Sequence, residues 1–83
     1  MKLKINPDFI FSKEKNVLKV TSVLPDQNEI FHFSGDVVQI LELSFGKHEV
    51  DRTFIQAQID KKINDQDWNQ LIQFLLDKNI VLK

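Results

Sequence analysis

Cysteine is the first absence in this sequence. None of the 83 residues is a cysteine, so no disulfide can staple the fold. Thiol catalysis, thiolate metal sites and thiol redox switches are excluded for the same reason. Only two glycines are present, Gly35 and Gly46. Since a phosphate-cradling loop needs several closely spaced glycines, no such loop is expected.

Long hydrophobic runs are also missing. No apolar run approaches the roughly 20 residues that span a bilayer. Residues 1–5 are not followed by the apolar run of a signal peptide. We therefore expect a soluble, cytoplasmic protein with no membrane partner.

An excess of charge of one sign is absent as well. The net charge is −1, with +3 over residues 1–20, −5 over 21–51 and +1 over 52–83. No stretch carries the dense basic field that phosphate binding normally needs. Nucleic acid is therefore not the expected partner.

What the sequence does contain is a large aromatic load for one small domain. A chain of 83 residues allows a single domain, residues 1–83, and a core of this size is thin. Seven phenylalanines and one tryptophan are explained by a thin core that needs large side chains. An aromatic binding surface is the alternative.

The first part of the chain has the pattern of β-strands. Apolar residues alternate or are β-branched there, and polar turns at 13–16 and 25–28 interrupt them. Residues 1–7 are expected to be an extended lead-in. The expected strands of an antiparallel meander span 9–14, 16–24 and 29–33.

From about residue 35 the apolar residues recur at helical spacing. Ser34 suits the N-cap of the first helix, and Gly46 suits its left-handed C-terminal cap. Asp51 and Asn64 suit the N-caps of the next two helices. The tail over 80–82 suits a short closing strand. The expected helices span about 35–45, 51–62 and 65–78.

This order predicts an α+β, winged-helix-like fold, with a three-stranded antiparallel sheet followed by three α-helices. The two short helices after residue 50 have the proportions of a helix-turn-helix.

No residue set predicts an enzyme. His32, Ser34 and Asp36 are too close in sequence to converge as a nucleophile set. Neither His32 nor His48 has a second ligand at metal-binding spacing. We expect no cofactor, no metal and no catalytic residue.

Three functions remain open. A winged helix-turn-helix DNA-binding regulator would read bases with the amides of the third helix, although its aspartates repel phosphate. A peptide-binding module would add a guest strand to the edge of the third strand, beside a helix with surplus apolar surface. A structural subunit would bind one protein and no short peptide.

The residues of the first and third helices resemble a known family. Val37, Ile40, Leu41, Leu43 and Gly46 follow the apolar-x-x-Ile-Leu-x-Leu-x-x-Gly spacing of the PqqD-like proteins. These proteins are precursor-peptide recognition elements of ribosomally made, modified peptides (RiPP recognition elements). The third helix and tail resemble the family's Asp-Val-x-x-Phe-Leu-x-x-Leu-x-x-x-Gly-Leu-Val pattern. The matching residues there are Asp67, Trp68, Leu71, Ile72, Leu75, Asn79, Ile80 and Val81.

The sequence departs from the family's cofactor-pathway members. Phe33-Ser34 stands where Leu-Asn is usual, Asn79 replaces a glycine, and the strand after Pro25-Asp26 is about two residues longer. These differences favour a related peptide pathway over the synthesis of pyrroloquinoline quinone.

The resemblance implies a non-catalytic chaperone for a leader peptide, which pairs with the third strand and packs on the third helix. The chaperone would present its precursor peptide to a modifying enzyme, such as a radical SAM or cyclising enzyme. The implied peptide-binding residues are Asn28, Glu29, Ile30, Phe31, His32, Phe33, Asp67, Trp68, Leu71, Phe74 and Leu75.

Overall fold

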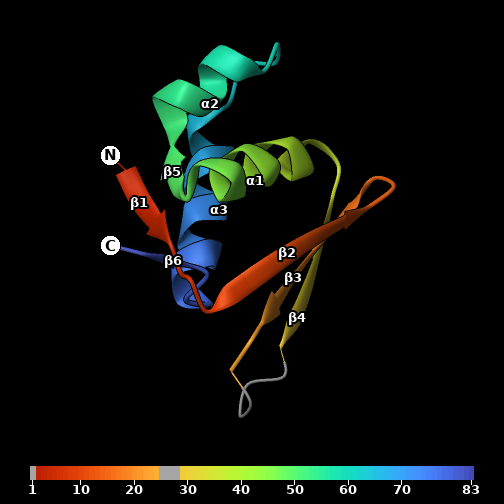
Figure 1. Ribbon diagram of the computed structural model, residues 1–83. Coiled ribbons are helices and arrows are strands. Elements are labelled where there is room, and N and C mark those ends of the chain that lie inside the picture. The colour runs from red at the N-terminus through yellow and green to blue at the C-terminus, as the bar shows by residue number, and fades with distance from the viewer. Residues whose placement is uncertain (1, 25–28) are drawn as a thin grey trace.

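The computed structural model describes residues 2–24 and 29–83 as six strands and three helices (Figure 1). In chain order these are β1 (Lys2–Ile5), β2 (Phe9–Glu14), β3 (Val17–Ser22), β4 (Ile30–Ser34), α1 (Asp36–Lys47), β5 (Glu49–Asp51), α2 (Arg52–Gln58), α3 (Asp65–Asp77) and β6 (Val81–Leu82). The expected α+β class is confirmed, and the arrangement is consistent with a winged-helix-like fold.

The expected meander forms the larger sheet, in the order β2-β3-β4, with both pairs antiparallel. A two-residue turn joins β2 to β3, because Glu14 pairs with Val17. Lys15 in this turn has φ 56°, as the tight turns of β-hairpins require.

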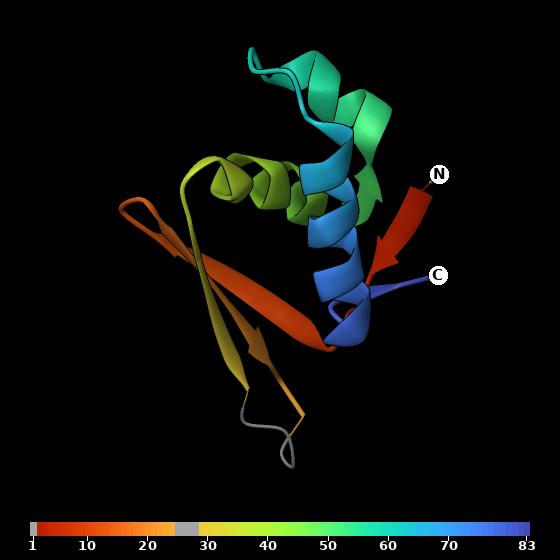
Figure 2. The same ribbon diagram turned by 180° about the vertical axis from the view of Figure 1, so that it is seen from behind.

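One face of this sheet is covered and the other is bare. Leu18 and Val20 of the central strand are fully buried, whereas Lys19 between them is exposed. The rings of Phe45 in α1 and Phe74 in α3 contact strand residues on the covered face. Both helices therefore lie on the same side of the sheet (Figure 2).

A second three-stranded sheet, in the order β5-β1-β6, was not expected from the sequence. Its strands are only two to four residues long, which is too short to show a hydrophobic period. The lead-in forms its central strand, where Leu3 lies opposite Val50 and Ile5 opposite Val81. This sheet ties both ends of the described chain to the segment between α1 and α2.

Two cap predictions were wrong. Ser34 stays in β4, opposite Val17. The chain turns at Gly35 instead, whose φ of 80° and ψ of −153° suit glycine, and no side chain caps α1. Gly46 lies inside α1, and His48 takes the left-handed conformation at φ 64°.

The other cap predictions are confirmed. Asp51 accepts hydrogen bonds from the N–H groups of Thr53 and Phe54, and Asn64 does the same for the first turn of α3. Asn79 is left-handed, with φ 60°.

Helix α2 is shorter than expected, because Gln56 organises the loop after it. Its side-chain amide donates to the Lys61 carbonyl at 2.9 Å and accepts from the Ile63 N–H at 2.8 Å.

The core lies between the two sheets and the helices. Its most buried members come from all parts of the chain: Leu18, Val20, Leu41, Val50, Ile55, Leu75, Ile80 and Val81. No helix among the described residues has both the length and the apolar content to cross a membrane.

Candidate functional site

Strand β4 is an edge strand: within residues 2–24 and 29–83, only β3 pairs with it. The Ser22 N–H donates to the Glu29 carbonyl at 3.4 Å. Because antiparallel strands bond through alternate residues, the backbone groups of Phe31 and Phe33 point toward β3. Those of Ile30 and His32 therefore point to the open side, where a guest strand can pair with them.

An aromatic cluster lies beside this open edge. Phe31 and Phe33 are half-buried on the covered face, and both rings meet the ring of Phe74 of α3 edge-on, with centroids 5.8 and 5.9 Å apart. Phe74 itself is still 38% exposed. The cluster therefore joins β4 to α3 and leaves apolar surface uncovered.

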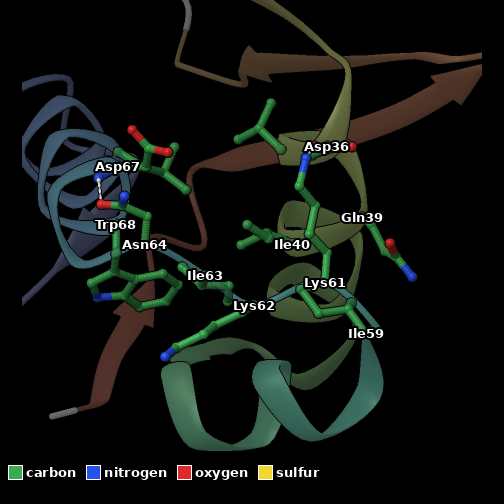
Figure 3. A pocket seen from close by; sticks show the side chains of 12 residues that line it. Asp36, Gln39, Ile40, Ile59, Lys61, Lys62, Ile63, Asn64, Asp67 and Trp68 are labelled. Atoms are coloured by element: carbon green, nitrogen blue, oxygen red, sulfur yellow. Dashed lines mark hydrogen bonds and ion pairs between the residues drawn. The ribbon is translucent and has the colours of Figure 1, made fainter.

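A pocket of about 260 Å³ lies where β4 leads into α1 (Figure 3). Its walls are apolar and come from α1, from the segment between α2 and α3, and from the first half of α3. These wall residues are Val37, Ile40, Ile59, Ile63, Trp68 and Leu71. The volume is below the roughly 300–1,000 Å³ of small-molecule sites, so the pocket suits one large side chain better than a cofactor.

The rim of the pocket is charged. Lys61 forms an ion pair with Asp36, and Figure 3 shows its side chain reaching toward Asp36 from the segment after α2. The hydrogen bond to the Asp36 carboxylate and the charge of that group raise the pKa of Lys61, and Asp67 adds to the effect. This ion pair links the segment between α2 and α3 to the start of α1.

Arg52 holds the part of the pocket wall that contains Ile63 and Trp68. Its guanidinium donates to the Ile63 carbonyl at 3.1 Å and to the Asp65 carboxylate at 2.5 Å. It also lies 5.6 Å from the centre of the Trp68 ring, within cation–π range. The indole is thereby held against the pocket.

The implied peptide-binding residues fall into two groups. Phe31, Phe33 and Phe74 form the aromatic cluster, with Ile30 (49% exposed) and His32 exposed on the bare face. A second group lines the pocket, namely Asp67, Trp68 and Leu71.

The other three implied residues lie outside both groups. Leu75 is 1% exposed and belongs to the core. Leu75 therefore does not lie on the surface beside β4, and it is left out of the proposed site. Glu29 is exposed and its carbonyl bonds to β3. Asn28 lies outside the described residues.

Sequence reasoning missed the pocket residues outside α3. Val37 and Ile40 looked like ordinary positions of an amphipathic helix, and Ile59 was assigned to a longer α2. Helix α2 ends at Gln58, and Ile59 and Ile63, which follow it, both line the pocket.

The opposite edge of the sheet has its own hollow. Strand β2 is also open on one side among the described residues. A broad hollow of about 870 Å³ lies beside it, lined by the start of the chain and by the end of α1. Its floor contains Phe11 and Phe45, whose ring centroids are 4.8 Å apart. Lys4, Lys47 and Glu49 also line it.

Metal chemistry has no support in the described part of the chain, where no three His, Asp or Glu side chains gather as a ligand set.

Comparison with protein-family models, with curated proteins and with solved structures gave no significant match. The likeness to the PqqD-like proteins thus depends on the sequence motifs alone.

Proposed function

We propose that this protein is a peptide-binding module that takes up an extended segment by strand addition at β4. The observation that carries the proposal is the open edge of β4 beside the exposed ring of Phe74. Backbone pairing supplies affinity that tolerates many sequences, and neighbouring pockets supply selectivity.

The open backbone groups are favourably placed for this role. Ile30 and His32 direct their N–H and C=O groups away from β3. A paired guest therefore breaks no bond of the sheet. Its inward side chains would contact Phe31, Phe33 and Phe74, which remain only partly covered.

The pocket extends this track. Asp36 and Val37 line it and follow β4 by only two and three residues. A guest chain that continues past the end of β4 would reach the apolar walls there. One large apolar side chain would fill the pocket and displace water from Trp68 and Leu71.

The guest we propose is the leader of a ribosomally made precursor peptide, as the likeness to the PqqD-like proteins implies. The protein would act in the cytoplasm without catalysing a reaction, and would present the precursor to a modifying enzyme of the radical SAM or cyclising type. This proposal requires that the bound peptide leave the rest of its chain free.

The test uses a peptide selected from a random twelve-residue library displayed on phage and then labelled with fluorescein. Ile30→Pro removes an N–H that points to solvent, which an edge strand tolerates. We expect it to weaken binding at least about tenfold, equivalent to about 1.4 kcal/mol, with little loss of stability. Fluorescence anisotropy and urea unfolding measure the two effects.

Phe31→Pro is the matched control, because its N–H points toward β3. This variant should lose stability through the broken ladder. If Ile30→Pro bound the peptide as tightly as the unmodified protein, strand addition at β4 would be excluded.

DNA binding is the second candidate, favoured by one observation. The amide residues of α3 recur on one side of the helix and are all exposed: Gln66, Asn69, Gln70 and Gln73. Exposed Asp65, Asp67 and Asp77 on the same helix repel phosphate. A duplex titration decides this, since specific DNA binding should weaken steeply as salt rises.

A further inference from the structure

The bare face of the larger sheet carries a cross-strand row of polar side chains that ends at the proposed binding edge. Lys19 lies directly opposite His32, and Ser12 lies opposite Lys19. All three side chains are exposed. No ion pair among the described residues includes Lys19 or His32. The row therefore contains one lysine with no acidic residue directly opposite it on either neighbouring strand.

We propose that the guest strand carries an acidic side chain opposite His32, flanked on both sides by apolar residues opposite Phe31 and Phe33. This inference rests on the proposed strand addition at β4. Side chains alternate between the two faces of a sheet. The guest residue opposite His32 therefore extends the row of Lys19, and its two neighbours point to the covered face.

Distance permits the charge contact. A guest strand lies about 4.8 Å from β4 and about 10 Å from β3, and lysine has a four-carbon stem that leans along the surface. Opposite charges on neighbouring strands stabilise a sheet, and like charges destabilise it. A glutamate at this position can meet the Lys19 ammonium and accept a hydrogen bond from His32.

The covered face of the sheet determines which side chains suit the two guest positions that flank the acidic residue. Phe31 and Phe33 are half-buried, and Phe74 presents an exposed ring between them. Apolar guest residues on that side would complete the aromatic cluster. The resulting pattern, apolar-acidic-apolar, reads the same in both chain directions, so it holds for a parallel or an antiparallel guest.

The experiment uses three fluorescein-labelled peptides of Ser and Thr with a central Val-X-Val, where X is Glu, Gln or Lys. Fluorescence anisotropy should rank their affinities Glu, Gln, Lys, with about three- to tenfold between Glu and Lys. Lys19→Glu should reverse the order. Lys83→Glu is the control, because it changes the charge equally at an exposed residue that lies outside the sheet, and the order should stay the same.

The outcomes separate the two proposals. Equal affinities that Ile30→Pro abolishes would overturn the acidic position and leave strand addition intact. Binding that Ile30→Pro leaves unchanged, or no binding of any of the three peptides, would overturn both. Reversal by Lys83→Glu as well as by Lys19→Glu would assign the preference to net charge and overturn the proposed role of Lys19.

Discussion

The two open edges of the larger sheet differ in what lies beside them. At β4 the neighbours are aromatic, and no charged side chain of β4 points to the covered face. At β2 the side chain of Lys13 lies on the covered face, opposite buried Leu18, and forms an ion pair with Glu42 of α1 at 3.1 Å. An inward-pointing charge on an edge strand is a known protection against pairing with another chain.

The aromatic residues do not separate the two edges in this way. Beside β2, Phe45 is 5% exposed and belongs to the core, and the ring of Phe11, tilted against it, keeps 42% of its surface exposed. Beside β4, Phe74 keeps 38% of its surface exposed. Apolar surface therefore remains exposed at both edges, and the inward-pointing charge of Lys13 is what distinguishes β2 from β4. Open backbone groups alone do not make a binding site.

The largest effect on stability is expected at the β2 side. Phe45→Ala should lower the free energy of unfolding by about 3–5 kcal/mol, as for other buried phenylalanines. The peptide affinity of the folded fraction should stay unchanged. Urea unfolding and anisotropy at low urea measure the two quantities. A drop in affinity as large as that of Phe74→Ala would contradict the assignment of Phe45 to the fold alone.

Phe74→Ala should have the opposite profile. Its ring is partly exposed and makes two edge-to-face contacts, so its loss should cost only about 1–2 kcal/mol of stability. Peptide affinity should fall at least about tenfold, because the guest loses its aromatic wall. Unchanged affinity would remove α3 from the proposed site.

Lys13→Val should open the β2 edge. Loss of an exposed ion pair costs about 0–1 kcal/mol, but the strand loses its protecting charge. We expect concentration-dependent dimers in analytical ultracentrifugation. Lys19→Val is the control: it removes the same charge from the central strand, which is paired on both sides, and should stay monomeric. Dimers of both variants would attribute association to charge loss instead.

The smallest expected effect is on the stability of the protein at low pH. Burial opposes ionisation of Asp51, but the N–H of Phe54 and the charges of Lys47 and Lys2 outweigh it and lower its pKa below 3.8. The ionised Asp51 therefore stabilises the fold. This stability is fully present above pH 3.8 and is lost as the pH falls through the lower pKa of the folded state.

Asp51→Asn keeps the capping oxygen and removes the titration. Its stability should therefore fall less steeply than that of the unmodified protein below pH 4, as followed by thermal unfolding. Since Lys47 lies in the hollow beside β2, peptide binding at β4 should be the same for both proteins at neutral pH. Identical acid profiles of the two proteins would mean that Asp51 contributes no charge-dependent stability.

The sequence by itself determined the elements whose signals are local. Alternation gave the three strands of the larger sheet, and helical spacing gave the three helices. Asp51 and Asn64 were identified as caps because a capping side chain bonds within three residues of its own position. The exposed and covered faces of β4 also followed from alternation alone.

Only the tertiary structure decided what depends on distant residues. The sheet of β1, β5 and β6 joins short segments with no readable period. The break after Gln58 depends on bonds from Gln56 to the loop, and the choice of Gly35 over Ser34 depends on how far β4 pairs with β3. Whether Leu75 or Phe74 is buried in the core depends on where α3 packs. The apolar stripe of this helix is wider than one contact needs, so the sequence alone does not fix which side of it faces the core.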